Sequence, residues 1–261
     1  MDLGLSGRCA LVLAGGGGLG SGVAKALAAE GSRVAVADLS EQRAKSTVES
    51  IRESGGVGVA FQCDLEERQS LAELVRTVRG GLGDPDILVN LTGGPPPTKA
   101  TGVDPEQWEA RFRSMVSNVI YLTDLVLPEM RAKRWGRIIT STSSGVIAPI
   151  PDLAMSNALR LCLLGWSKTL AGEVGREGIT CNVVVPGRIA TQRIVELDAS
   201  RAQREGQLVE DIVRNSTKAI PVGRYGTVEE YAAVVAFLAS SVASYITGST
   251  IRVDGGLLPS V

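Results

Sequence analysis

Short apolar runs rich in β-branched residues alternate with longer amphipathic stretches along the chain. The apolar runs, which predict strands, lie at 9–13, 33–37, 58–63, 87–91, 137–140, 180–185 and 250–253. The stretches between them carry apolar residues at helical spacing and predict helices near 19–30, 41–54, 66–79, 105–131, 152–175 and 227–239. Strict alternation, with strands apolar on both faces, predicts an α/β fold in which helices cover each side of a parallel sheet.

Two stretches break this alternation. A glycine–proline run, GGPPP at 93–97, follows the fourth predicted strand, and a long polar segment, 187–216, follows the sixth. Both begin at the carboxyl ends of strands, where open α/β sheets bind their ligands. The second is long enough to cover a substrate as a lid. Because no repeat or linker divides the 261 residues, we expect one domain, 1–261, with 187–216 as its lid.

The overall charge is nearly balanced, with 27 Lys and Arg, 28 Asp and Glu, and a formal net charge of −1. With no block of like charges, neither nucleic acid nor a membrane surface is expected as a partner. The first residues contain no signal-like apolar core, and no apolar run is long enough for a bilayer span. Four widely spaced cysteines, each in an apolar run, predict buried free thiols and a reducing, cytoplasmic location.

The chain contains no histidine. This excludes Ser-His-Asp and Cys-His hydrolases, histidine acid–base catalysis and the common zinc sites, and no metal is expected. Any acid–base chemistry must therefore come from serine, tyrosine, lysine, carboxylates, a cofactor or water.

Residues 10–20, ALVLAGGGGLG, run from a strand through a glycine-rich turn into a helix. Glycines let the backbone approach a pyrophosphate, and the helix amino terminus supplies N–H donors and partial positive charge. Asp38 ends the second strand, 18 residues after Gly20, where a carboxylate bonds ribose hydroxyls and repels a 2′-phosphate. This position favours NAD over NADP, and the open alternative is an ordinary solvated loop aspartate.

Polar residues also end the next two strands. Asp64, after the third strand, is placed to bond an adenine amino group, and the run Asn90-Leu91-Thr92-Gly93 ends the fourth. In their order and spacing, these motifs and the glycine turn resemble the short-chain dehydrogenase/reductase family over practically the whole chain. The other motifs that carry the resemblance are Asn118, the strand end at 137–144, Pro186-Gly187 and Val253-Asp254-Gly255-Gly256.

The resemblance implies a doubly wound, seven-stranded, Rossmann-like sheet, a nicotinamide dinucleotide and, commonly, a tetramer. We therefore expect a homo-oligomer, tetramer or dimer, that acts on a small-molecule substrate. Leu13 and Ala14 stand where the family has Thr-Gly, and alanine is small enough for a tight turn. The residues expected to hold the cofactor are Gly15, Gly18, Leu19, Gly20, Asp38, Asp64, Leu65, Asn90, Gly93, Arg160, Pro186, Gly187, Ile189 and Thr191.

In this family a serine holds the carbonyl oxygen, a tyrosine exchanges the proton, and a lysine lowers the pKa of that tyrosine and grips the nicotinamide ribose. An asparagine one helix earlier holds a water of the proton relay. Asn118 and Ser143 match the asparagine and the serine. Ser156, 13 residues after Ser143, and Arg160 take the tyrosine and lysine places, at an i, i+4 spacing that shares one helical face.

This exchange removes the usual proton donor. A serine hydroxyl is a much weaker acid than a phenol, whose pKa is about 10, and arginine keeps its proton. Arg160 can still hold ribose hydroxyls, a developing alkoxide or a substrate carboxylate. Candidate replacements for the donor are Tyr121, Asp152 and Tyr225, or a water held by Ser143 and Ser156.

Arg188 directly follows Pro186-Gly187, near where the family places the nicotinamide carboxamide. If Arg160 and Arg188 both face the cleft, their field favours an anionic substrate. The equally open alternative is that Arg188 points to solvent or caps a helix.

The sequence thus predicts an NAD(P)(H)-dependent oxidoreductase that transfers hydride to or from a small carbonyl or alcohol, with a rearranged proton relay. Two alternatives stay open. One is a non-redox lyase or dehydratase that uses Arg160, Arg188 and Ser143 to hold an enolate. The other is a nucleotide-binding protein without catalysis.

Overall fold

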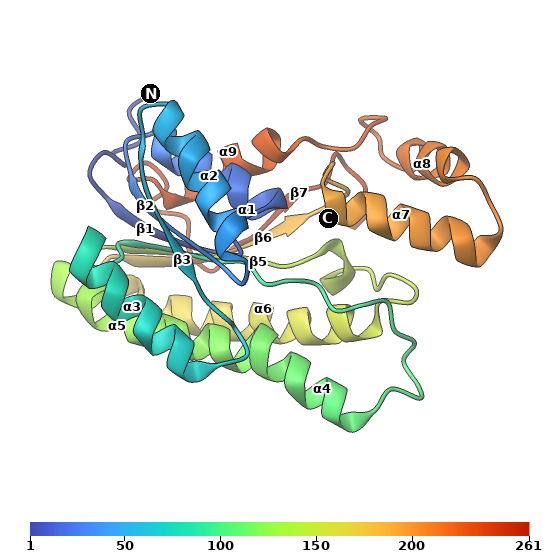
Figure 1. Ribbon diagram of the computed structural model, residues 1–261, viewed down its shortest axis with the longest axis horizontal. Helices are drawn as coiled ribbons and strands as arrows, with labels where there is room; N and C mark the ends of the chain where they lie inside the picture. Colours follow the sequence, from blue (N-terminus) through green and yellow to red (C-terminus); the bar gives the residue numbers. More distant parts are fainter. Residues whose placement is uncertain (261) are drawn as a thin grey trace.

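A computed structural model describes residues 1–260 and shows a parallel sheet between two layers of helices (Figure 1). The strands are β1 (Cys9–Leu13), β2 (Arg33–Asp38), β3 (Val57–Gln62), β4 (Ile87–Asn90), β5 (Gly136–Ser141), β6 (Ile179–Pro186) and β7 (Thr250–Val253). They form one seven-stranded sheet in the order β3-β2-β1-β4-β5-β6-β7, and every neighbouring pair is parallel. The predicted doubly wound, Rossmann-like fold is confirmed.

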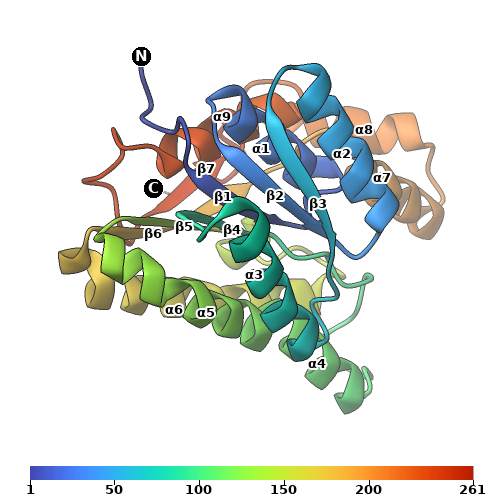
Figure 2. The same ribbon diagram turned by 60° about the vertical axis from the view of Figure 1, so that its left-hand side comes forward.

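Helices cover both faces of the sheet (Figure 2). The first face packs against α1 (Gly18–Ala29), α2 (Glu41–Glu53) and α9 (Val228–Ala239), and the second against α3 (Arg68–Leu82), α5 (Asn118–Lys133) and α6 (Ala154–Val174). Strand β1 shows why the strands are apolar throughout: Ala10 and Val12 face the first layer, while Leu11 and Leu13 face the second. Burying each large aliphatic side chain stabilises the fold by about 1.5–3 kcal/mol.

Three local features differ from the expected pattern. The helix expected near 105–131 is divided into α4 (Pro105–Phe112), a π-helical turn (Arg113–Ser117) and α5. The polar 187–216 segment contains α7 (Gln192–Glu205) and the start of α8 (Val209–Lys218). These helices were not predicted, because the segment has few apolar residues at helical spacing. Cys162 is exposed, contrary to the expectation of four buried thiols, because it lies on the outward face of α6.

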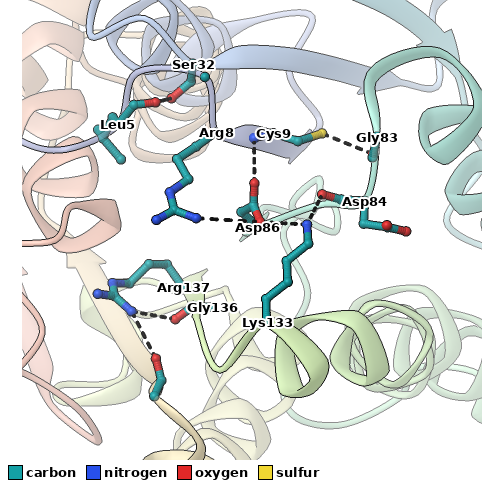
Figure 3. Close-up of polar contacts among 12 residues, drawn as sticks. Leu5, Arg8, Cys9, Ser32, Gly83, Asp84, Asp86, Lys133, Gly136 and Arg137 are labelled. Atoms are coloured by element: carbon teal, nitrogen blue, oxygen red, sulfur yellow. Dashed lines mark hydrogen bonds and ion pairs between the residues drawn. The ribbon is translucent and has the colours of Figure 1, made fainter.

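The amino ends of β1, β4 and β5 are joined by a polar cluster (Figure 3). One carboxylate oxygen of Asp86 accepts from the N–H of Cys9 at 3.0 Å, and the other accepts from Nζ of Lys133 at 2.8 Å. Arg137 is buried there and donates to three backbone carbonyl oxygens, while its guanidinium carbon lies 4.4 Å from the ring centroid of Trp135. These groups bond protein atoms throughout, so this end of the sheet is structural.

The opposite edge holds the carboxyl ends of the strands. The chain order reverses between β1 and β4, which are paired neighbours. Loops leaving two adjacent strands at such a reversal diverge to opposite faces of the sheet, and the crevice between them is the usual ligand site. The glycine turn follows β1 and the glycine–proline run follows β4, so both predicted ligand loops border this crevice.

Candidate active site

The glycine turn after β1 forms a close-fitting backbone cradle. Its start is held by the N–H of Gly15, which donates to the Ala37 carbonyl oxygen at 2.9 Å. A Cβ on Gly20 would lie 2.1 Å from the carbonyl oxygen of Ala14, so glycine is needed there, and the φ of +50° at Gly18 favours glycine. Helix α1 has Gly17 as its N-cap and no side-chain cap, which leaves first-turn N–H groups for a phosphate. The cradle therefore fits a dinucleotide diphosphate.

Asp38, at the end of β2, accepts three hydrogen bonds from the protein. They come from the N–H groups of Gly16 and Ser40, at 3.0 and 2.9 Å, and from Nη2 of Arg43 at 2.8 Å. Asp38 is buried at the turn, so it is not the solvated loop aspartate of the alternative interpretation. The sequence had not singled out Arg43, which adds a positive charge beside this carboxylate.

Asp64 and Leu65 follow β3, and Asn90 is the last residue of β4. One oxygen of Asp64 accepts from the N–H of Glu66 at 2.8 Å, and Leu65 lies beside it in the same loop. The Asn90 side chain is buried and its amide nitrogen lies 3.5 and 3.4 Å from the hydroxyls of Thr123 and Thr140. Asn90 therefore ties β4 to α5 and β5 through its amide nitrogen, while its buried Oδ1 has no hydrogen-bond partner within residues 1–260.

Arg160 lies beneath the crevice, where α6 passes the ends of β4 and β5. Its Nη1 donates to the carbonyl oxygen of Ser141 at 3.3 Å, and its Nη2 donates to those of Thr92 and Gly93 at 3.2 and 3.3 Å. The residue is only 7% exposed. Burial lowers the pKa of Arg160 to about 10, so the guanidinium stays protonated at neutral pH. A fixed positive charge thus underlies the carboxyl ends of the two central strands.

Ser143 lies in the segment after β5, and Ser156 lies on α6, the helix that also carries Arg160. Ser143 follows β5, and its Oγ accepts from the N–H of Gly145 at 3.2 Å, so its own proton remains available to a substrate oxygen. Ser156 lies one helical turn before Arg160 on α6 and is buried. Within residues 1–260, the Ser156 hydroxyl makes no hydrogen bond to the protein. At the predicted positions, Ser143, Ser156 and Arg160 thus offer hydrogen-bond donors for a substrate oxygen, and none of the three carries a phenol.

Asn118 does not join this group through its side chain. Its Nδ2 donates to the Leu65 carbonyl oxygen at 2.7 Å, and its Oδ1 accepts from Nε of Arg68 at 3.2 Å. The π-helical turn just before Asn118 shifts the helical register, so this side chain faces α3, while Met115 of that turn packs with Met155 and other apolar side chains of α6. A relay water held by the Asn118 side chain next to Arg160 is not supported by this geometry.

Arg188 is committed to a buried ion pair. Its Nη1 lies 2.6 Å from Oδ1 of Asp198 on α7 and donates to the Tyr225 hydroxyl at 3.1 Å, and that hydroxyl donates to Oδ2 of Asp198 at 2.8 Å. The Asp198 side chain is 2% exposed. The charge of Arg188 is thus neutralised within the protein, contrary to the expectation that it helps attract an anion.

The remaining predicted cofactor residues line the loop from β6 to α7. Pro186 ends β6, and a Cβ on Gly187 would lie 2.6 Å from the Cα of Asp254, so glycine permits the close contact with the segment after β7. Ile189 is buried in the core beneath the loop. Thr191 is the N-cap residue of α7 and lies near Gly18, at the glycine turn. Helix α7 therefore starts next to the predicted diphosphate position.

Among residues 1–260, none of the three candidate proton donors forms a hydrogen bond or ion pair with Ser143, Ser156 or Arg160. Tyr121 lies beside Arg68, Asp152 pairs with Arg204 at 3.7 Å, and Tyr225 bonds Asp198. The tyrosine that does approach Arg160 is Tyr231 of α9.

Tyr231 is wholly buried, and its hydroxyl donates to Ser141 Oγ at 2.7 Å. Burial raises the pKa of Tyr231 to about 12, against opposing effects of the Ser141 hydrogen bond and the Arg160 charge. The sequence signal was present but missed: a buried phenol in an aliphatic helix needs a hydrogen-bond partner.

Other sites are not evident elsewhere in the described chain. A cavity of about 720 Å³ lies between α3, α4 and α6, but none of the predicted site residues lines it. No cluster of three or more metal-binding side chains occurs within residues 1–260. In the same range, no helix is long and apolar enough to cross a membrane.

The sheet, the glycine cradle and the carboxylate ending β2 define a dinucleotide-binding protein of the α/β class. Residues 13–258 match the family described as enoyl-(acyl carrier protein) reductase. The chain is 34% identical over 253 residues to the 3-oxoacyl-[acyl-carrier-protein] reductase FabG of Salmonella typhimurium, covering 96% of this chain and 97% of that one. It belongs to the short-chain dehydrogenase/reductase family, whose members are NAD(P)-dependent oxidoreductases.

Solved structures agree with this assignment. L-sorbose reductase from Gluconobacter frateurii, solved with NADPH and L-sorbose, superposes with a TM-score of 0.94 at 28% identity over 100% of both chains. A 7α-hydroxysteroid dehydrogenase solved with NADH gives a TM-score of 0.90 at 27% identity, covering 98% of this chain and 96% of that one. Similar proteins therefore hold either nicotinamide dinucleotide.

Proposed function

We propose that this protein is an oxidoreductase that transfers hydride between a nicotinamide dinucleotide, preferably NAD(H), and a small carbonyl or alcohol substrate through a rearranged proton relay. The observation that carries the proposal is the position of Arg160, a permanent cation bonded to the ends of β4 and β5 beneath the cofactor crevice. The glycine cradle supports dinucleotide binding, and Asp38 supports the preference for NAD, because its carboxylate would repel a 2′-phosphate. The same side chain keeps Arg43 engaged, which removes a cation that would otherwise attract that phosphate.

The bound dinucleotide would supply or accept the hydride, and the chain positions and polarises the substrate. The Ser143 hydroxyl donates to the substrate oxygen, and the field of Arg160 stabilises negative charge that develops on that oxygen. Because arginine does not release its proton, a water held by Ser143 and Ser156 would deliver the proton during reduction, and exchange with solvent would return a proton to the hydroxide left behind. Electrostatic stabilisation and positioning can account for much of the rate when acid catalysis is weak.

Three features outside the reaction centre belong to the same proposal. The chain forms a single domain in which the 187–216 segment covers the bound substrate as a lid. The start of α7 beside the glycine cradle supports this role, because it places the segment at the edge of the cofactor site. The protein works as a homo-oligomer, either a tetramer or a dimer, because oligomers are common in its family. Its free cysteines suit a reducing, cytoplasmic location.

Turnover of a panel of small ketones, aldehydes and alcohols, followed by nicotinamide absorbance, tests the proposed reaction. The double variant Ser156→Tyr with Arg160→Lys should gain activity, since it places a phenol and a lysine at the family positions. A folded double variant with no more activity than the parent on any substrate would contradict a simple loss of the relay. Substrate conversion without any absorbance change would favour the lyase or dehydratase hypothesis, in which Arg160 holds an enolate.

A further inference from the structure

Arg160 is a buried cation with unused donors. A guanidinium has five N–H groups, and the three hydrogen bonds to the carbonyl oxygens of Ser141, Thr92 and Gly93 leave two of them without a protein acceptor in the described chain. None of its neighbours that affect its pKa is a carboxylate: they are Tyr231 and Arg193. A buried charge without a counter-ion is costly, so this site favours an incoming anion.

Arg137 provides a comparison within the same chain. Arg137 is also buried and donates to three carbonyl oxygens, and its guanidinium carbon lies 4.4 Å from the ring centroid of Trp135. That arginine lies at the amino ends of the strands, away from the crevice. Arg137 also has no carboxylate partner in the described chain, so what distinguishes Arg160 is its place beneath the crevice at the carboxyl ends of the strands.

A second guanidinium approaches the same loop from the lid. Arg193, in the first turn of α7, donates from Nη2 to the Pro95 carbonyl oxygen at 2.7 Å. Glycine at position 94 eases this approach, since a Cβ there would lie 3.3 Å from Nη2 of Arg193. The proline run that begins at Pro95 fixes the backbone of this loop. Arg160 and Arg193 therefore bond carbonyl groups of one short loop, residues 92–95: Arg160 bonds residues 92 and 93 from below, and Arg193 bonds residue 95 from the predicted lid.

The lid arginine also has little internal compensation. Its nearest carboxylate, Glu196, is 4.0 Å away and 57% exposed, so the pair contributes little. Arg188, the cation first expected in the cleft, is neutralised by Asp198. Thr92 adds a buried hydroxyl without a hydrogen-bond partner at the same loop. The groups that converge here are two cations and an unused hydroxyl, a set suited to a carboxylate.

We propose that Arg160 and Arg193 recognise a carboxylate of the substrate, so that the protein acts on small oxo acids and the corresponding hydroxy acids. This inference rests on the proposed hydride transfer and names its substrate class. Arg193 exchanges the neutral carbonyl of Pro95 for a carboxylate, which forms the stronger, charge-assisted hydrogen bond. Because Arg193 lies on α7, the exchange couples substrate charge to the position of the lid.

Calorimetric titration with matched anionic and neutral probes tests this proposal without relying on turnover. Oxamate and oxamide have the same size and differ in charge, and malonate and malonamide form a longer pair. In the presence of saturating NADH, we expect at least one carboxylate to bind and its neutral counterpart not to bind. Binding of the anion should weaken as salt is raised, because screening reduces the attraction.

Variants of α7 locate the recognition site. Arg193→Gln should weaken carboxylate binding by about tenfold or more, the scale of one lost hydrogen bond to a charged group, while NADH affinity stays unchanged. Arg193→Lys, which keeps the charge, should lose less. Arg201→Gln is the matched control, since Arg201 lies on the same helix and pairs with Glu205 at the surface.

Each contrary result has a distinct meaning. If NADH binds and the charged and neutral probes bind equally, or neither binds, the carboxylate proposal is wrong while the dinucleotide function stands. If Arg193→Gln weakens NADH binding and leaves carboxylate binding intact, Arg193 holds the cofactor diphosphate, and the proposal is also wrong. If NADH itself does not bind, the proposed function fails before the substrate class is in question.

Discussion

Tyr231 and Ser141 form a buried hydroxyl pair whose contribution to stability can be worked out from the structure. The two oxygens are 2.7 Å apart, with Tyr231 fully buried and Ser141 5% exposed. Removing one partner leaves the other without its hydrogen bond in an environment closed to water, at a cost of about 1–3 kcal/mol. Removing both leaves no unsatisfied group, so the pair should show strong thermodynamic coupling.

We therefore expect Tyr231→Phe and Ser141→Ala each to lower the free energy of unfolding by about 2 kcal/mol. In a chain of this size that corresponds to a fall in Tm of roughly 4–8 °C. The double variant should lose no more than either single variant. Tyr245→Phe, which alters a fully exposed tyrosine, should change stability by less than about 0.5 kcal/mol.

Urea unfolding of the four proteins, with thermal unfolding as a second measure, gives the coupling energy. We expect a coupling of about 2 kcal/mol or more between the two sites. Additive effects, within about 0.5 kcal/mol, would show that Tyr231 and Ser141 act independently.

Three further results are expected. Under native conditions at neutral pH, a maleimide should label only Cys162, and after denaturation it should label all four thiols, as counted by mass spectrometry. Burial protects the other thiols, and it raises the pKa of Cys9 to about 11 and that of Cys181 to about 12. The hydrogen bond from Arg224 lowers the pKa of Glu230 from 4.5 to about 2, so the ionised Glu230 stabilises the fold fully above pH 4.5 and this contribution is lost as the pH falls towards 2. In acid titrations followed by circular dichroism, Glu230→Gln should lack this pH-dependent loss of stability. Arg188→Met should reduce stability by about 3 kcal/mol in urea unfolding, because it leaves the buried Asp198 without its cation.

Much of the fold follows from hydrophobic pattern alone. The predicted bounds of β1 and β7 agree with the structure, and the seven strands were located because each is a short apolar run between amphipathic helices. The helical spacing of Ser156 and Arg160 also placed both on one face of a helix, and the structure has both of them buried on α6. Local periodicity and spacing are sufficient for such features.

The side-chain partners could not be predicted in the same way, because they depend on residues far apart in sequence. The Asp198 partner of Arg188 lies on α7, a helix that polar composition concealed. Tyr231 reaches Ser141 across 90 residues, and Arg193 reaches Pro95 across 98. The direction of Asn118 depends on a π-helical turn, and a continuous helical pattern gives no sign of the register shift that such a turn introduces.

Calorimetric titration of the protein with NADH and NADPH, beside the Asp38→Ser variant, tests the central claim most directly. The account predicts that the parent protein binds NADH more tightly than NADPH. The variant should shift towards NADPH, because the substitution removes a negative charge and frees Arg43 to meet the 2′-phosphate. Failure of the parent protein to bind either dinucleotide would contradict the account, since the glycine cradle and Arg160 would then serve no nicotinamide cofactor.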